Sequence, residues 1–256
     1  MGVEVTRDGE VLEVTINRPK ANAIDAATSQ ELSTIFESFM NDTNLRVAIL
    51  TGSGSKFFSA GWDLVAAKEG EAFESDYGVG GFGGICELKF RPKPIIAAVN
   101  GMAVGGGFEI ALAADFIVAA DHATFFLPEA TLGLIADNAT IRLPKILPPS
   151  IAREMLISGR RMLATEAQSW GIVNEVTSAD DLLPAARQLA QRICQSAPLS
   201  VTAVLDLMRS LESVASNDAM KVLRNNDSYR AAIDSLDANE GTIAFAEKRK
   251  PNWQGR

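Results

Sequence analysis

NGMAVGGGFEIALAAD, residues 100–115, decides the expected fold because it joins a strand end, a glycine-rich turn and a helix. The strand is PIIAAVNG, residues 94–101, a short apolar run of the kind found in strands that are buried on both faces. The first turn of a helix leaves backbone N–H groups without partners, and glycine lets a ligand approach them closely. The stretch therefore predicts a strand–turn–helix unit that can bind a ligand at its turn.

Similar patterns recur on both sides of this stretch. Residues 2–7 and 11–16 alternate apolar and polar side chains around Asp8-Gly9, a dipeptide favoured in two-residue turns, and so predict an antiparallel hairpin. Three more short apolar runs are typical of strands: RVAILTG (46–52), FIVAA (116–120) and ATFFL (123–127). Strand–strand–helix units therefore recur, and the fold class is expected to be α/β.

Helical patterns fill much of the remaining chain. Residues 26–40 place apolar side chains at helical spacing, with Asp25 or Thr28 as the expected N-cap. Thr165 and Gln168 match a capping box ahead of a short helix and a strand at 172–176. After about residue 179 only helical patterns occur. We expect a core domain, 1–198, and a helical C-terminal region, 199–256, that packs on the core or on a neighbouring subunit.

The composition restricts the classes of partner. The chain has 256 residues, of which 47% are hydrophobic, with 24 Lys and Arg against 32 Asp and Glu. A net charge of -8 argues against nucleic acid or an anionic membrane as the main partner. The start of the chain lacks a basic stretch followed by an apolar run, and no window has about 18 uninterrupted apolar residues. We therefore expect a cytoplasmic protein without a membrane span.

The scarcity of histidine and cysteine restricts the chemistry. His122 is the only histidine, so a multi-histidine metal site is excluded and a Ser-His-Asp triad would depend on this one residue. Cys86 and Cys194 lie far apart without CxxC spacing, which predicts free thiols and no metal cluster. Acid–base chemistry near neutral pH must then come from carboxylates.

Two turns are candidates for binding an oxyanion. In FFSAGWDL, residues 57–64, a small residue and a glycine follow a strand, so that the N–H group of Ala60 can point into a cleft. A second N–H group comes from the glycine turn before the helix. Two such donors aimed at one point suit a thioester carbonyl that becomes an enolate. Glu109 lies one helical turn beyond Gly106 and is a candidate base, although the glycines can equally serve close packing.

A second carboxylate follows in FFLPEATLGL, residues 125–134. Pro128 interrupts the preceding strand and presents Glu129 among apolar neighbours, which raises the pKa of a carboxyl group. Such a shift lets one carboxyl hold a proton while the other stays ionised. The alternative is that Glu129 is a helix N-terminal residue that interacts with the helix dipole.

Taken together, these motifs resemble the crotonase (enoyl-CoA hydratase/isomerase) family over essentially the whole chain. FSAGWDL and NGMAVGGGFE are similar to its two oxyanion-hole motifs, LPEATLGL to its acidic loop, and NRPKANAID to its coenzyme A contact region. The resemblance implies a ββα spiral core, a helical C-terminal region that completes trimers or dimers of trimers, an acyl-CoA thioester substrate, and no metal or other cofactor.

The resemblance also implies roles for particular residues. Ala60 and Gly106 would supply the oxyanion-hole N–H groups, and Glu109 and Glu129 would be the acid–base pair. The residues implied in substrate and coenzyme A binding are Lys20, Ala21, Ala23, Gly61, Trp62, Asp63, Gly105 and Asp137. Lys20 is a candidate phosphate contact or a solvated surface lysine.

Further motifs resemble the carnitinyl-CoA dehydratase subgroup of that family, among them GGFEIALAADFIVAAD, IRLPKILPP and AFAEKRKPNWQGR. This resemblance implies reversible hydration of a 2-enoyl-CoA, with carnitinyl-CoA as the hydrated form. Trp62 is similar to a tryptophan of the subgroup. It is a candidate wall for a trimethylammonium group, because aromatic faces attract cations, or else a packing residue.

One segment departs from the family pattern. Residues 136–140, ADNAT, lack the family's glycine pair. The added β-carbons, and the branched Thr140, are expected to narrow the acyl pocket or to change how the start of that helix approaches the thioester. Asp137 keeps the acid of the subgroup, as a ligand contact or a helix cap. The alternatives are a double-bond isomerase that uses one glutamate and a catalytically silent acyl-CoA-binding homologue. The acyl group and the favoured direction stay open.

Overall fold

The computed structural model describes residues 2–256 and separates the chain into two compact units. The core unit contains the described residues up to Lys89 together with Ile95–Ala190, and the helical unit contains Phe90–Pro94 and Gln191–Arg256. The predicted division after residue 198 therefore differs from the observed one, which falls inside helix α7 (Leu182–Cys194). Pro198 is the first residue of helix α8 (Pro198–Ser210) and starts that helix without ending the core.

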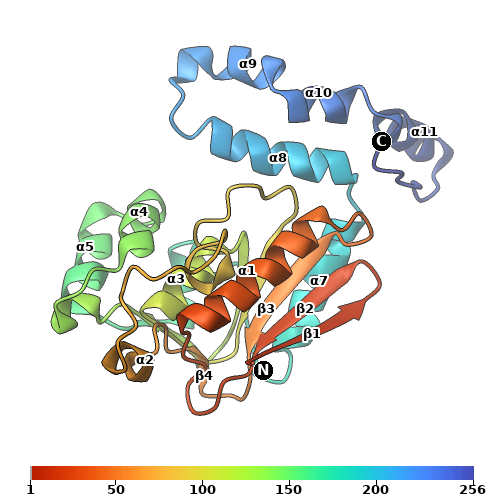
Figure 1. Cartoon of the computed structure of the whole chain (residues 1–256). Helices are drawn as coiled ribbons and strands as arrows, with labels where there is room; N and C mark the ends of the chain where they lie inside the picture. Colours follow the sequence, from red (N-terminus) through yellow and green to blue (C-terminus); the bar gives the residue numbers. More distant parts are fainter. Residues whose placement is uncertain (1) are drawn as a thin grey trace. The chain divides into compact units, whose positions relative to one another are not determined.

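The larger sheet of the core unit consists mostly of parallel strands (Figure 1). Its order is β1 (Val3–Asp8), β2 (Val11–Ile16), β3 (Val47–Gly52), β5 (Ile95–Val99), β7 (Phe116–Ala120) and β10 (Glu175–Thr177). The antiparallel hairpin of β1 and β2 is confirmed. Its turn lies one residue later than predicted, at Gly9 and Glu10, because Asp8 pairs with Val11. Strands β3 and β5 are buried at every residue, as predicted.

A smaller second sheet brings the functional turns together. Its order is β4 (Phe57–Ser59), β6 (Met102–Val104), β8 (Thr124–Phe126) and β9 (Met162–Leu163). Strands β4, β6 and β8 each follow a strand of the larger sheet, and β6 leads through Gly105 into helix α3 (Gly106–Ala113). The predicted strand–strand–helix unit is confirmed there, and the turns after β4 and β6 lie side by side because these strands are paired in parallel.

Helices cover the sheets and follow the predicted patterns with one exception. Helix α1 (Ala26–Asn41) begins after Asp25, whose side chain accepts a hydrogen bond from the N–H group of Thr28, and it buries Leu32, Phe36 and Phe39. Helix α6 (Ala164–Ser169) has Leu163 at its N-cap and no side-chain cap. The predicted Thr165–Gln168 capping box is therefore wrong, because the helix begins before Thr165. The remaining elements of the core unit are α2 (Leu64–Lys68), η1 (Phe82–Gly84), η2 (Glu129–Leu132), α4 (Asp137–Ile146) and α5 (Pro149–Ser158).

The helical unit contains α8, α9 (Ser216–Asn225), α10 (Asp227–Ile233) and α11 (Leu236–Glu247), so the prediction of helices alone in the tail is confirmed. Asn226 links α10 to α8 by donating to Asp206 at 2.8 Å, and the Thr202 hydroxyl holds residues 90–94 through the Pro92 carbonyl at 2.9 Å. Helix α9 buries no residue, and Phe245 on α11 is 88% exposed. Within residues 2–256 no helix is long and apolar enough to cross a membrane.

Candidate active site

A cavity of about 190 Å³ lies in the core unit beside the turns after β4 and β6. Seven of the residues implied in catalysis or binding line it: Ala60, Trp62, Gly105, Gly106, Glu109, Glu129 and Asp137. Lys20 lines a second cavity together with the cationic side chains of Arg18 and Lys56. Four of the implied residues line neither of these cavities: Ala21, Ala23, Gly61 and Asp63.

Gly106 supplies one N–H group that is open to the cavity. It is the first residue of α3, and its N–H group has no hydrogen-bond partner among residues 2–256, as the first turn of a helix dictates. The N–H group of Gly105 is engaged with the Phe126 carbonyl at 2.9 Å. The glycine turn therefore offers the donor that the sequence predicted at Gly106.

The donor predicted at Ala60 is contradicted. The Ala60 N–H group donates to the Ala21 carbonyl at 2.9 Å, so it is occupied inside the protein. The amide groups that flank Trp62 are also occupied: the Gly61 carbonyl accepts from Ile24, and the Asp63 N–H group donates to the Ile24 carbonyl. These bonds leave the N–H group of Trp62 without a partner among the described residues.

Gly61 brings the Trp62 amide group to the start of α3. Gly61 has a φ of 78°, which turns the chain between β4 and α2. A β-carbon on Gly61 would lie 2.7 Å from the backbone nitrogen of Gly106, so the two turns are in close contact. Trp62 and Gly106 therefore line the same cavity from two touching turns, and each has an N–H group without a partner among residues 2–256. No local sequence signal marks this donor, because the carbonyl group that occupies the Ala60 N–H group belongs to Ala21, which is distant in the sequence.

Glu109 is a buried carboxylate at the cavity wall, with 6% of its surface exposed. Its Oε1 atom accepts a hydrogen bond of 2.8 Å from the Ala139 N–H group in α4. Burial, with smaller contributions from the charges of Asp137 and Glu129, raises the pKa of Glu109 to about 7 against the lowering effect of the Ala139 hydrogen bond. This carboxyl can therefore exchange a proton near neutral pH.

Glu129 lies against the glycine turn at Gly105. It is the first residue of η2, which agrees with the alternative interpretation of Glu129 as a residue at a helix N-terminus. It also lines the cavity. Its Oε1 atom would overlap a β-carbon on Gly105, and its Oε2 atom is buried without a hydrogen-bond partner in the described part of the chain. Burial raises the pKa of Glu129, and the charge of Asp137 contributes in the same direction.

The side chains of Ala139 and Thr140 do not narrow the cavity as expected, whereas Asp137 and Asn138 of the same segment line it. Ala139 and Thr140 are not among its lining residues, and the Thr140 hydroxyl donates back to the Ala136 carbonyl at 2.7 Å. The backbone of Ala139 still holds Glu109 through the bond described above. Asp137 is the residue of this segment with a charge on the cavity wall, and it stands at the first position of α4.

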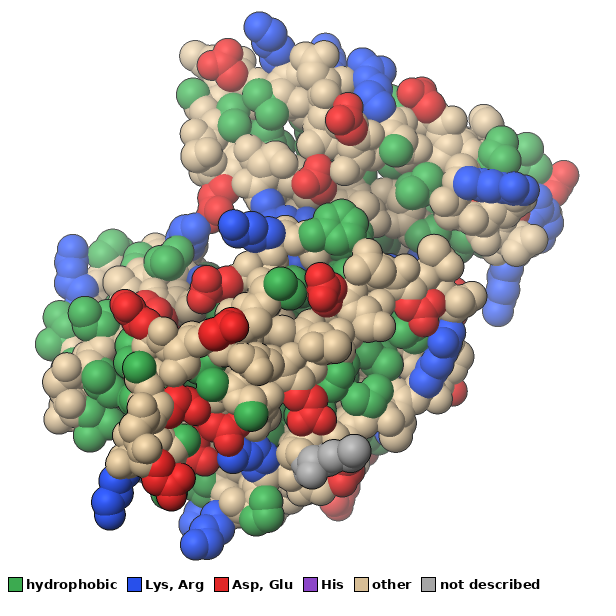
Figure 2. Space-filling view, viewed as in Figure 1, with side chains coloured by type: hydrophobic (Ala, Val, Ile, Leu, Met, Phe, Trp, Pro, Cys, Tyr) green, Lys and Arg blue, Asp and Glu red, His purple; other side chains and the backbone are tan. Residues whose placement is uncertain are grey.

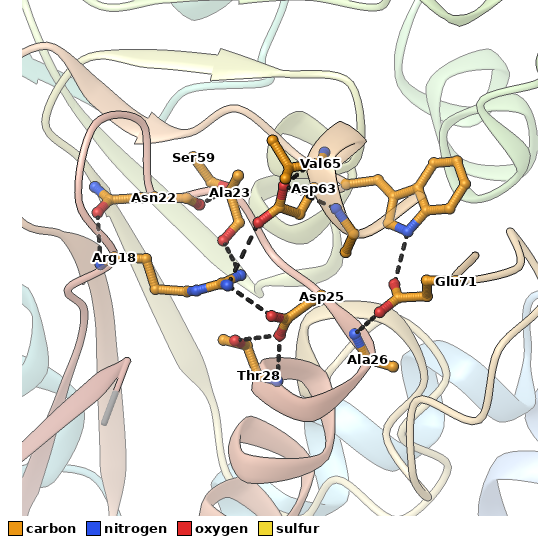
Figure 3. A network of polar contacts seen from close by, with 12 residues as sticks. Arg18, Asn22, Ala23, Asp25, Ala26, Thr28, Ser59, Asp63, Val65 and Glu71 are labelled. Carbon is orange, nitrogen blue, oxygen red and sulfur yellow. Dashed lines mark hydrogen bonds and ion pairs between the residues drawn. The ribbon is translucent and has the colours of Figure 1, made fainter. Parts of the chain in front are cut away.

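A polar network fixes the chain beneath the Trp62 turn (Figure 3). Arg18 donates to the Ala23 carbonyl and to Asp25, both at 2.6 Å, and pairs with Asp63 at 3.4 Å. Asp63 also caps α2 through the N–H groups of its first turn. Ala21, Ala23 and Asp63 therefore build the frame of the turn, and their contact with coenzyme A stays a prediction.

The Trp62 side chain is held at its edge. The indole Nε1 donates to Glu71 at 2.8 Å, and the other carboxylate oxygen of Glu71 accepts from the Ala26 N–H group at the start of α1 (3.0 Å). The Trp62 and Phe73 rings meet edge to face with centroids 5.5 Å apart. The Trp62 side chain therefore lines the cavity and also packs against Phe73. Its role as a wall for a trimethylammonium group stays a prediction.

Sequence reasoning missed the loop between α2 and β5, which adds Phe73, Tyr77, Phe82 and Glu87 to the cavity wall. The loop has no apolar periodicity that would have marked it. Its signal is the alternation of aromatic residues and glycines in DYGVGGFGG, residues 76–84. No group of three or more His, Cys, Asp or Glu side chains within residues 2–256 is arranged to hold a metal ion.

Comparison with known proteins places this site in a family context. The sequence profile of Enoyl-CoA hydratase/isomerase matches residues 6–256. Carnitinyl-CoA dehydratase of Salmonella arizonae is 54% identical over 256 residues, with 99% of this chain and 98% of the relative covered. The protein of the same name from Escherichia coli K12 is 54% identical over 257 residues, with the same coverage.

Solved structures agree with these sequence relatives. Enoyl-CoA hydratase of Mycobacterium tuberculosis H37Rv superposes with a TM-score of 0.92 at 38% identity, covering 100% of this chain and 99% of that one. Enoyl-CoA hydratase of Bacillus anthracis superposes with a TM-score of 0.90 at 31% identity, covering both chains completely. The expected crotonase fold is thereby confirmed, and the chain belongs to the enoyl-CoA hydratase/isomerase family.

Proposed function

We propose that this chain is a hydro-lyase that interconverts carnitinyl-CoA and crotonobetainyl-CoA plus water. The observation that carries the proposal is the convergence of two partnerless N–H groups and two carboxyl groups with raised pKa values on one cavity. The relatives named carnitinyl-CoA dehydratase support the identity of the acyl group. The proposal needs no metal or redox cofactor, because coenzyme A enters with the substrate.

The N–H groups of Trp62 and Gly106 would bind the thioester oxygen. Addition of water at the β-carbon moves negative charge onto this oxygen as the enolate forms. Fixed donors stabilise that charge without reorganisation, and each is typically worth about 2.7 to 4 kcal/mol in the transition state. The short contact between the Gly61 turn and Gly106 supports a common target for both donors.

The two glutamates would divide the proton transfers. Ionised Glu109 takes a proton from water as the water oxygen bonds to the β-carbon, and protonated Glu129 gives its proton to the α-carbon. Glu109 ends protonated and Glu129 ionised, so exchange with solvent restores the starting state. Raised pKa values favour such a pair, and burial raises the pKa of Glu109 to about 7 and also raises that of Glu129.

The proposal is tested by following the enoyl-thioester absorbance when the protein meets crotonobetainyl-CoA or crotonyl-CoA. We expect faster loss of absorbance with the betaine. Activity on crotonyl-CoA alone would retain the hydratase and reject the carnitine substrate. Double-bond migration without incorporation of labelled oxygen from water would instead identify an isomerase, and binding without either reaction a silent homologue.

We further propose that the protein assembles as a trimer or a dimer of trimers through its helical unit. Exposed apolar side chains support this: α8 presents Met208, α9 presents Met220 and α11 presents Phe245, all more than half exposed. A cytoplasmic location and the lack of nucleic-acid partners also stay proposals, which cell fractionation and an electrophoretic shift assay would test.

A further inference from the structure

Two aromatic rings from the loop after α2 line the cavity next to the oxyanion donors. Tyr77 and Phe82 meet edge to face with centroids 5.4 Å apart. The Tyr77 hydroxyl donates to the Phe73 carbonyl at 2.8 Å, which fixes the orientation of the ring. A β-carbon on Gly106 would lie 2.5 Å from Cε1 of Phe82, so this ring touches the residue that carries one donor.

The loop is fastened to α1 by two buried serines. The Ser33 hydroxyl donates to the Tyr77 carbonyl at 2.9 Å and accepts from the Gly80 N–H group at 3.2 Å. The Ser29 hydroxyl accepts from the Gly83 N–H group at 3.1 Å. The loop backbone is therefore bonded to α1 at Tyr77 itself and on both sides of Phe82.

The cavity wall is strongly acidic. Its lining residues include the carboxylates of Glu87, Glu109, Glu129 and Asp137, and they include no Lys, Arg or His. Figure 2 shows acidic side chains gathered on the face of the core unit around α2. A neutral acyl chain gains nothing from such a wall, whereas a fixed positive charge is attracted by each of these groups that is ionised.

Asp137 lines the same cavity as the aromatic pair and the acid–base pair. It lies two residues before Ala139, whose N–H group holds Glu109. The negative charge of Asp137 acts on residues of both pairs. Burial is the largest cause of the raised pKa values of Glu109, Glu129 and Tyr77, and the charge of Asp137 adds to each of these increases. Its Oδ1 atom accepts from the Asn138 N–H group at 2.6 Å, and Oδ2 has no hydrogen-bond partner among residues 2–256.

We propose that Asp137, Tyr77 and Phe82 form a subsite for a quaternary ammonium group at the end of the acyl chain. The subsite deepens the proposed function and rests on it. A quaternary ammonium is suited to this wall because it has no N–H group to donate and cannot lose its charge. Aromatic rings attract such a cation electrostatically, and a carboxylate beside them completes the recognition. Glu109 and Glu129 stay reserved for proton transfer.

The test uses saturated thioesters, which cannot be hydrated, so that binding is measured apart from turnover. The pair is γ-butyrobetainyl-CoA and the neutral thioester in which a carbon atom replaces its quaternary nitrogen. Isothermal titration calorimetry gives Kd for each. We expect the wild type to prefer the betaine by about tenfold or more, and Asp137→Asn to lose about tenfold of that preference.

Tyr77→Leu should lose several-fold of the preference for the betaine thioester. Asp137→Asn and Tyr77→Leu should both keep the wild-type Kd for the neutral thioester. An unchanged Kd also shows that the variants are folded. Glu74→Gln is the matched control, because Glu74 is exposed in the same loop and does not line the cavity. It removes the same charge and should leave the preference unchanged.

Equal Kd values for the two thioesters in the wild type would overturn the subsite, and so would a preference that survives both Asp137→Asn and Tyr77→Leu. The proposed function fails separately. If crotonobetainyl-CoA is not hydrated but the preference and its loss in the variants are observed, the subsite stands and the reaction must be reassigned. If hydration proceeds and the preference is absent, the reaction stands and the subsite fails.

Discussion

Gly61 is a residue at which the backbone leaves no room for a side chain. Its φ of 78° disfavours any L side chain, and a β-carbon would lie 2.7 Å from the Gly106 nitrogen. We expect Gly61→Ala to separate the Trp62 and Gly106 donors and to lower kcat by on the order of 10²-fold. Steady-state kinetics on crotonobetainyl-CoA measures this.

The control for that substitution is Gly171→Ala. Gly171 has a φ of 80°, but a β-carbon there meets no atom within 4 Å. The control therefore carries the same backbone strain without the contact. If both variants lose kcat equally, the effect is strain alone and the donor pair at the Gly61 turn is wrong.

Glu109 links the pH dependence of stability to the active site. Burial raises its pKa from 4.5 to about 7, so between these pH values the folded state binds more protons than the unfolded state. The stability of the wild type therefore falls as pH rises through this window, by up to about 3 kcal/mol from this group. Glu109→Gln removes this pH-dependent contribution, so the variant should gain stability relative to the wild type as the pH rises from 4.5 to about 7.

Urea unfolding at about pH 5 and about pH 8 measures that difference. Glu37→Gln, an exposed substitution on α1, is the matched control. Its free energy of unfolding should differ from that of the wild type by the same amount at both pH values. If the difference in free energy of unfolding between Glu109→Gln and the wild type does not increase with pH, Glu109 ionises normally in the folded protein.

Individual site residues were predictable to different degrees. Glu109 and Gly106 follow from a helix that begins at a glycine turn, because helix geometry fixes both the open N–H group and the face one turn later. The donor at Trp62 was not predictable in this way. Whether Ala60 or Trp62 offers its amide group depends on the Ala21 carbonyl, which occupies Ala60 from a distant part of the sequence.

At the scale of elements, the α1 helix and the loop 76–84 act together. Ser33 is buried, and its hydroxyl makes one bond as donor and one as acceptor to the loop backbone. Ser33→Ala should cost about 1 to 2 kcal/mol of stability and leave the Tyr77 ring less well positioned. We expect Kd for γ-butyrobetainyl-CoA to rise and the loop to be cleaved faster in limited proteolysis.

Ser38→Ala is the control on the same helix, since Ser38 is exposed and its side chain makes no described hydrogen bond. It should leave both measurements unchanged. Unchanged cleavage and affinity in Ser33→Ala would mean that packing, without these hydrogen bonds, holds the loop in place.

Elements were predictable where a pattern repeats. Alternation gave the hairpin of β1 and β2, and continuous apolar runs gave β3 and β5, because buried strands must be apolar on both faces. The loop between α2 and β5 could not be predicted, since its course is set by serines on α1 and not by its own periodicity. The start of α6 was misplaced because a capping pattern is local and weak.

For the whole molecule, assembly is the main expectation. Exposed apolar side chains on the helical unit, such as Phe245, are costly in water and are expected to be buried between subunits. Light scattering on the purified protein should give a mass three or six times that of the chain. Phe245→Asp should lower that mass, whereas Glu212→Gln on the same unit should not. A wild-type monomer would refute the assembly.

The overall fold was predictable because the motifs extend over the whole chain in a fixed order. The division into units was not, because α7 runs continuously across residues 190 and 191 and no break in the sequence marks that point. Contacts made after folding, such as those of Pro92 with α8, decide which unit a short segment joins.

The glycine-rich loop has a consequence for protein engineering. A β-carbon on Gly83 would overlap Ile110, and one on Gly84 would overlap Leu32, so these positions tolerate little mutation. Tyr77 and Phe82 have side chains that face a cavity and can be exchanged. A combinatorial library aimed at new acyl chains should therefore randomise the two aromatic positions and hold the glycines constant, which would preserve folding while diversifying the catalyst.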